Sequence, residues 1–294
     1  MQPQGILRIA FSVLGVGLLV CAAAPAWGGS PEHQERHFIV KDHPFVVLQN
    51  IVNGRIEVKS WKNSEVVVSS TSAPGQVGID IEQVGDRIEI NANSLEPGSE
   101  PNEVEVNFQL TVPEKTELQL RTQTGLIYVE QVNGDMKLQS VAGDVHLKEV
   151  SGYIIVKTTG GTLICTQCAG KLEFTTISGN AQILQPTLTS LNAMTTTGNI
   201  LYDGDFMHTG MYSMNSGRGL VEVRFSGNDS FDLKAQTLLG HVDNQAAAFL
   251  KPDTHGGHHT VSKFSKGLFG TVGQGLAKVE LSSYSGTIRI LKRD

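Results

Sequence analysis

A glycine recurs every nine residues through the middle of this 294-residue chain, and this spacing limits the fold more than any other feature. The second and fourth residues after each glycine are apolar, as in Gly143 followed by Val145 and Leu147. Alternation with a period of two is typical of a strand with one buried face. Each nonapeptide therefore predicts one short strand and one corner, where we expect glycine to supply a positive φ. The glycines at this spacing are Gly125, Gly134, Gly143, Gly152, Gly161, Gly170 and Gly179.

The residue three positions before each glycine indicates that the structural unit is two nonapeptides. Small hydroxyl residues alternate there with long polar residues, as in Thr122, Gln131 and Ser140. Two kinds of corner are therefore expected, with two strands in a coil of about 18 residues. Small insertions interrupt this longer frame, whose marker glycines are Gly125, Gly143, Gly161, Gly179, Gly198, Gly219, Gly240 and Gly286. The hydroxyl residues three positions before them are Thr122, Ser140, Thr158, Thr176, Thr195, Ser216, Thr237 and Ser283, and we expect this ladder to satisfy backbone groups of the turns.

The apolar positions of the 18-residue frame predict one continuous core. Positions seven and five before each marker glycine, and two and four after it, are apolar in 31 of 32 cases, with Asn244 the exception. Stacked coils of this kind form a parallel β-solenoid, whose rungs bury a shared core and whose ends need caps. The fold class predicted is therefore all-β, a parallel β-solenoid of about 18-residue two-strand coils with an N-terminal antiparallel β cap.

The chain divides into a leader, a cap and the solenoid. Residues 1–26 are expected to be a signal peptide, 27–36 a linker, 37–117 the cap and 118–294 the solenoid. Within the cap, Asn53-Gly54 predicts a hairpin turn. The repeat is interrupted by an irregular insert at 245–276, after which 277–292 supplies a last rung.

The first residues have the pattern of a secretory address. Arg8 precedes an apolar run of residues 9–24, and Ala24-Pro25-Ala26 is a small-x-small cleavage pattern. We therefore expect export to the periplasm, the cell surface or the medium, with no membrane span after signal cleavage. Cys21 is a weaker alternative as a lipid attachment site, because the branched Val20 stands where a small residue is expected.

The run LQLRTQTGLIYVEQVNGDMKLQSVAGDVHL and the ending GQGLAKVELSSYSGTIRI carry a family resemblance. They resemble a family of bacterial secreted β-strand-repeat proteins, a domain of unknown function that bears the label putative adhesin. The entry TVPEKTELQLRT, with Pro113 before the first rung, fits as well, and the resemblance covers about residues 40–292. It implies a β-solenoid in the bacterial envelope or outside it, and it implies no reaction.

Two clusters could carry metal or redox chemistry. Cys165 and Cys168 form a C-x-x-C whose readings are core packing, a disulfide, or a redox or metal site. We favour core packing, because both occupy apolar positions of the repeat. His255, His258 and His259 are weak metal candidates, since they lie in a glycine-rich insert without helical spacing.

The pattern disfavours three other classes of repeat protein. Calcium-binding β-rolls need aspartate in successive turns, but only Asp135 and Asp144 follow the seven regularly spaced glycines. Hexapeptide acyltransferases need an apolar residue at 144, and Asp144 breaks that frame. Carbohydrate-cleaving β-helices need clustered outer carboxylates, whereas the acids of the rungs are scattered over Glu130, Asp135, Asp144, Glu149 and Glu173.

The function expected from these patterns is a non-enzymatic, exported interaction module of the envelope or cell surface, without a cofactor. Its partner is expected to be an envelope or surface protein or a glycan. A net charge of −6 argues against nucleic acid. The alternatives are a carbohydrate-binding or carbohydrate-active β-helix and a metal-binding protein that uses the His-rich insert. For a carbohydrate, Tyr128 and Tyr153 are the outward aromatic candidates, while Tyr202 and Tyr212 have an inward register.

Overall fold

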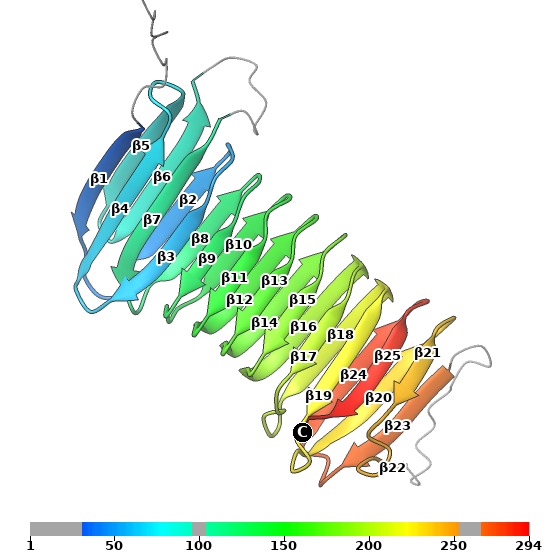
Figure 1. Cartoon of the computed structure of the whole chain (residues 1–294). Helices are drawn as coiled ribbons and strands as arrows, with labels where there is room; N and C mark the ends of the chain where they lie inside the picture. Colours follow the sequence, from blue (N-terminus) through cyan, green and yellow to red (C-terminus); the bar gives the residue numbers. More distant parts are fainter. Residues whose placement is uncertain (1–30, 96–103, 253–265, 294) are drawn as a thin grey trace, which may run out of the picture.

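Alternating apolar residues place one strand of each coil in each of two facing sheets, which build an elongated stack (Figure 1). The computed structural model describes residues 31–95, 104–252 and 266–293, and these contain strands without a helix. The expected parallel β-solenoid with antiparallel N-terminal strands is confirmed. The predicted signal peptide, Cys21 and the three candidate histidines of the insert lie outside the described residues.

The strands fall into two sheets, named A and B here. In spatial order, sheet A consists of β1 (Glu32–Ile39), β4 (Glu65–Ser72), β7 (Val106–Pro113), β3 (Ile56–Trp61), β9 (Ile127–Glu130), β11 (Val145–Lys148), β13 (Leu163–Thr166), β15 (Ala181–Leu184), β17 (Ile200–Asp203), β19 (Leu220–Phe225), β25 (Thr287–Lys292) and β21 (His241–Asn244). Sheet B consists of β22 (Lys251–Pro252), β23 (Lys266–Val272), β20 (Phe231–Thr237), β24 (Ala277–Ser283), β18 (Met211–Arg218), β16 (Thr187–Thr197), β14 (Ala169–Thr176), β12 (Ser151–Thr158), β10 (Met136–Ser140), β8 (Glu117–Thr122), β2 (Phe45–Asn50), β6 (Arg87–Ser94) and β5 (Val77–Val84).

The pairing register of the central rungs follows the 18-residue frame. In sheet B, Met136 lies opposite Ile154, and in sheet A, Val145 lies opposite Leu163. Each parallel pair brings residues 18 apart side by side, so identical positions of successive coils form columns along the solenoid. The inward columns are buried and make the continuous core.

The solenoid extends into the region expected to be the cap. β2 and β3 pair in parallel with β8 and β9 on one side and with β6 and β7 on the other. The Asn53-Gly54 hairpin prediction is wrong, because this turn joins strands of opposite sheets. Gly54 instead continues the glycine column, since a Cβ at Gly125 would overlap the Gly54 carbonyl oxygen.

The rung expected to come last is the penultimate one in space. β24 lies between β18 and β20, and β25 lies between β19 and β21 (Figure 1). The chain therefore leaves one gap in the stack after β19, builds the terminal rung first, and fills the gap with its C-terminal strands. Both ends of the solenoid thus contain a rung that is out of chain order.

Antiparallel strands flank the solenoid at each end. β1 pairs with β4, β4 with β7, and β5 with β6 at the N-terminal end. Part of the expected linker is ordered, because β1 begins at Glu32. Part of the expected irregular insert is also a strand, since β23 pairs antiparallel with β20 over Lys266–Val272.

The marker glycines are required by close approach of stacked corners more than by a positive φ. Gly125, Gly152, Gly170 and Gly219 have a positive φ, but the other seven predicted turn glycines do not. A Cβ at Gly143 would overlap the carbonyl oxygen of Gly125 in the preceding coil. The expectation that every corner glycine supplies a positive φ is therefore wrong, and the nine-residue spacing reports backbone contact between coils.

The left-handed conformation of the alternate corner is held by long polar residues. Gln131, Glu149, Gln167 and Gln185 have φ values of 58°, 54°, 55° and 49°. The first three occupy the position that alternates with the hydroxyl ladder in the sequence. These side chains point to solvent and can bond to one another, as Gln131 Nε2 does to Glu149 Oε2 at 2.8 Å.

The hydroxyl ladder is buried and satisfies corner backbone groups, as expected. Ser140 Oγ accepts a hydrogen bond from Gly143 N at 2.7 Å, and Ser216 Oγ donates to the Gly198 carbonyl at 2.7 Å. Thr158 Oγ1 donates to Thr176 Oγ1 of the next coil at 2.9 Å. The column therefore ties each turn either to itself or to its neighbour.

Ser216→Ala should lower the free energy of unfolding by about 1 kcal/mol, because it deletes a buried hydrogen bond of ordinary strength. The corresponding decrease in melting temperature is about 2–4 °C for a domain of this size. Ser213→Ala is the matched control on the same strand, since Ser213 faces solvent. Equal melting temperatures of the two variants in thermal denaturation would contradict a stabilising role for the ladder.

Candidate interaction surface

The outer face of sheet A carries ion pairs on the strands to either side of its middle. Lys148 on β11 lies 2.7 Å from Glu130 on β9. Near the C-terminal end, Arg289 on β25 lies 3.2 Å from Glu222 and 3.1 Å from Asp243 on the two neighbouring strands. These charges are largely neutralised within the face, and they cross-link successive rungs.

The middle strands of sheet A, β13 and β15, carry no charge, and their outward apolar residues Ile164 and Leu184 are only partly exposed. The outward positions of two successive strands in the middle of sheet B are also uncharged. We call these seven outward residues the sheet B patch: Ser190, Asn192, Met194 and Thr196 on β16, and Met211, Ser213 and Asn215 on β18. Met194 and Met211 expose 47% and 64% of their surface, which is high for methionine. Charged residues return on the flanking strands, with Lys171 and Glu173 on β14 and Lys278 and Glu280 on β24.

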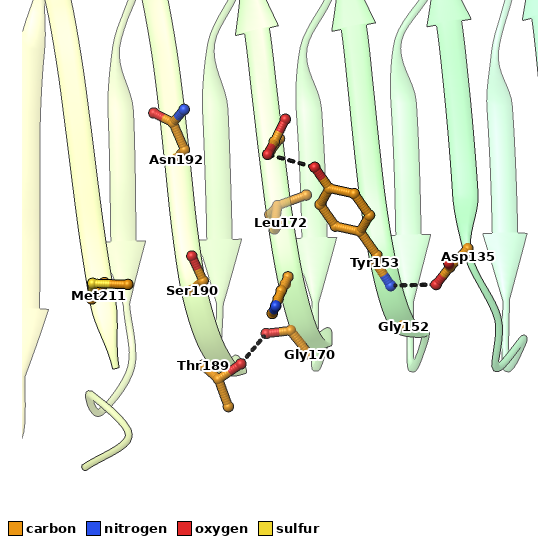
Figure 2. A pocket seen from close by; sticks show the side chains of 11 residues that line it. Asp135, Gly152, Tyr153, Gly170, Leu172, Thr189, Ser190, Asn192 and Met211 are labelled. Atoms are coloured by element: carbon orange, nitrogen blue, oxygen red, sulfur yellow. Dashed lines mark hydrogen bonds between the residues drawn. The ribbon is translucent and has the colours of Figure 1, made fainter. Parts of the chain in front are cut away.

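A groove of about 940 Å³ begins at one side of the sheet B patch and extends across β14 to β12 (Figure 2). Its lining consists of Asp135, Gly152, Tyr153, Gly170, Lys171, Leu172, Glu173, Thr189, Ser190, Asn192 and Met211.

The sequence builds this groove from two local features. Gly152 and Gly170 lie side by side at the starts of β12 and β14 and present no side chain there. A β-bulge follows in β16, where Gly170 pairs with Leu188 but Lys171 pairs with Ser190. The extra residue, Thr189, donates a hydrogen bond from Oγ1 to the Gly170 carbonyl at 3.1 Å. Its sequence signal is the single 19-residue step from Gly179 to Gly198.

Tyr153 is the aromatic residue of the groove, and two carboxylates hold it in place. Its hydroxyl donates to Glu173 Oε1 at 2.6 Å, and its backbone N–H donates to Asp135 Oδ1 at 3.0 Å (Figure 2). The hydrogen bond to Glu173 raises the pKa of the Tyr153 hydroxyl above its ordinary value, which already keeps the group protonated at neutral pH. The ring is 38% exposed, and no ion pair links Glu173 to a cation in the described ranges.

The structure places the predicted aromatic and acidic residues as follows. Tyr153 faces outward and Tyr128 is partly exposed, whereas Tyr202 and Tyr212 are buried, in agreement with the predicted register. Asp135 and Asp144 act within the fold, since each accepts a hydrogen bond from a backbone N–H of the next coil. The sequence interpretation missed the joint position of Tyr153 and Glu173, because they belong to different columns of the repeat.

Cys165 and Cys168 form a disulfide, and both are fully buried. Their side chains occupy the core, so the pair fills apolar positions of the repeat and is also covalently linked. Within the described ranges, no group of three or more His, Cys, Asp or Glu side chains could hold a metal ion.

The fold and the repeat are matched by a family model. The match covers residues 51–291, from the segment before β3 to β25, under the description Toastrack DUF4097. The chain belongs to this family. The region matched by the Toastrack family model includes the central rungs of the solenoid, the sheet B patch and the groove. A search among curated proteins finds no match to the chain.

Several solved structures are similar to this chain at low sequence identity. A putative adhesin from Bacteroides fragilis is 11% identical, has a TM-score of 0.50, and covers 89% of this chain and 97% of its own. A putative cell adhesion protein from Clostridium sporogenes is 11% identical with a TM-score of 0.30, covering 89% and 100% of the two chains. A putative lipid binding protein from Parabacteroides distasonis is 12% identical with a TM-score of 0.27, covering 90% and 98%. At these identities the likeness concerns the fold alone.

In the described part of this Toastrack chain, no helix has the length and apolar character needed to cross a membrane.

Proposed function

We propose that the protein is an exported, non-enzymatic binding module that contacts a partner in the cell envelope through the outer face of sheet B. The observation that carries the proposal is the difference between the two outer faces. Sheet A pairs its charges across neighbouring rungs and keeps the outward Ile164 and Leu184 of its middle partly buried, whereas the sheet B patch exposes two methionines and borders the groove. Exposed methionine and a low density of charge are typical of surfaces that are covered by a partner.

The leader pattern of residues 1–26 supports export, and the buried disulfide is compatible with an oxidising compartment. A rigid solenoid also suits a binding role, because side chains on stacked strands keep fixed mutual positions over a long flat face. Binding through such a face needs no catalytic group.

Site-specific photo-crosslinking in the native cell tests the proposal. A photoreactive residue in place of Ser213 in the sheet B patch should form crosslinks to an envelope component. The same residue in place of Gln182, which points outward from β15 in sheet A, is the matched control and should give few. Mass spectrometry of the product should find a mature N-terminus after Ala26. Equal crosslinking from both positions, or a cytoplasmic protein that retains residues 1–26, would contradict the proposal.

A further inference from the structure

The groove combines the groups that recognise sugars. An exposed tyrosine ring offers an apolar face to the C–H groups of a pyranose. The Glu173 carboxylate, the Asn192 amide and the Ser190 hydroxyl can accept or donate hydrogen bonds to its hydroxyls. Figure 2 shows Tyr153 reaching from β12 toward β14, with Asn192 and Ser190 on the next strand. A few fixed polar groups beside an apolar platform are typical of small-molecule sites.

These polar groups repeat along the solenoid axis. Glu173, Asn192 and Ser213 lie opposite one another in the register of β14, β16 and β18 and therefore form one row. Neighbouring strands are about 4.8 Å apart, which is comparable to the length of one pyranose ring. Consecutive sugars of a chain lying across the strands can therefore meet equivalent side chains on consecutive rungs.

The charges of the surface favour a ligand without charge. The seven residues of the sheet B patch carry none, and the groove contains two acids, Asp135 and Glu173, against one base, Lys171. An acidic chain would face these carboxylates, and a basic partner would find no acidic group beyond them on β16 and β18. A neutral chain avoids both costs, because its hydroxyls can form hydrogen bonds with Glu173 and Lys171 without adding a charge.

We propose that the groove and the sheet B patch bind a neutral oligosaccharide that runs along the solenoid axis, with one sugar ring packed on Tyr153 and bonded to Glu173. This inference rests on the proposed function, since it names the ligand class of the same face. The sugar packed on Tyr153 is the anchor, and the row through Asn192 and Ser213 holds the following units.

Binding of neutral hexasaccharides to the full mature chain tests the inference. The probes are hexamers of β1,4-linked glucose, α1,4-linked glucose, β1,4-linked mannose and N-acetylglucosamine, with a hexamer of galacturonic acid as the charged comparison. We expect at least one neutral hexamer to bind, as measured by titration calorimetry, and the charged hexamer to bind more weakly. Tyr153→Ala should weaken the affinity about tenfold or more, since the stacked ring is removed.

Variants of matched character locate the site. Tyr153→Phe keeps the ring and removes only the hydroxyl that bonds to Glu173. If the ring makes the main contact with the sugar, the affinity of this variant should stay within about threefold of the parent value. Glu173→Gln should also weaken binding. Tyr284→Ala is the control, because Tyr284 is 56% exposed and lies outside the groove. Circular dichroism melts show whether each variant remains folded.

The outcomes separate this inference from the proposed function. Failure of every neutral hexamer, together with crosslinking of the Ser213 position to an envelope protein, would overturn the glycan ligand and leave the binding face supported. Tighter binding of the galacturonic acid hexamer would overturn the neutral ligand class. Equal binding by the parent and Tyr153→Ala would overturn the location. Absence of both glycan binding and crosslinks from the sheet B patch would overturn both proposals.

Discussion

Leu147→Asp is expected to abolish the folded solenoid at neutral pH. Leu147 is 1% exposed and lies between Val129 and Cys165 in neighbouring rungs of sheet A. The substitution removes a core side chain, which costs about 2–5 kcal/mol. It also places an unpaired carboxylate in an apolar interior, which adds several kcal/mol more. The sum is comparable to the whole stability of an ordinary domain, about 5–15 kcal/mol.

The measurement is far-ultraviolet circular dichroism of the purified variant, with urea denaturation where folded protein remains. His146→Asp is the matched control, because His146 directly precedes Leu147 in β11 and points outward from the sheet. That variant should keep the strand spectrum and a melting temperature near the parent value. A folded Leu147→Asp protein beside an unfolded His146→Asp protein would show that the inward register of β11 is reversed.

Gly143→Val is expected to destabilise the solenoid by about 3 kcal/mol or more, the upper range of overpacking in a close-packed structure. A Cβ at Gly143 would overlap the Gly125 carbonyl oxygen and lie 2.8 Å from both the Gly125 carbonyl carbon and Ser140 Oγ. The obstacle is backbone of the adjacent rung, which cannot rotate away as a side chain can. The effect does not depend on φ, so Gly143→Ala should be damaging as well.

Gly160→Val supplies the control, because a Cβ at Gly160 meets only the Ser178 carbonyl oxygen at 3.7 Å. Thermal melts should show a decrease of about 6 °C or more for Gly143→Val, at roughly 2–4 °C per kcal/mol, and a small change for Gly160→Val. Similar melting temperatures for these two variants would exclude coil-to-coil contact as the reason for the marker glycines.

The candidate site was only partly accessible to sequence reasoning. The period of two identifies Tyr153 as an outward aromatic residue, and the structure agrees. The groove itself depends on Gly152 and Gly170 being neighbours and on the bulge at Thr189. A 19-residue step between marker glycines marks an insertion, but it does not say in which strand or toward which face the extra residue projects. The hydrogen bond between Tyr153 and Glu173 joins two different positions of the repeat, since Tyr153 lies opposite Lys171 in the strand register. A comparison of equivalent repeat positions therefore does not predict it.

The sequence by itself determined the content and register of the central rungs. This is possible because each rung contacts its neighbours at a constant separation of 18 residues, so the pattern along the chain is also the pattern in space. The tertiary structure alone decided the order of the rungs at both ends. At the N-terminal end, β2 and β3 lie in the stack between β6 and β7 on one side and β8 and β9 on the other. At the C-terminal end, β24 and β25 fill the gap before β20 and β21. The physical reason is that every rung presents the same apolar faces and the same strand edges to its neighbours. Several orders therefore satisfy the local pattern, and the long connections and end strands select one of them.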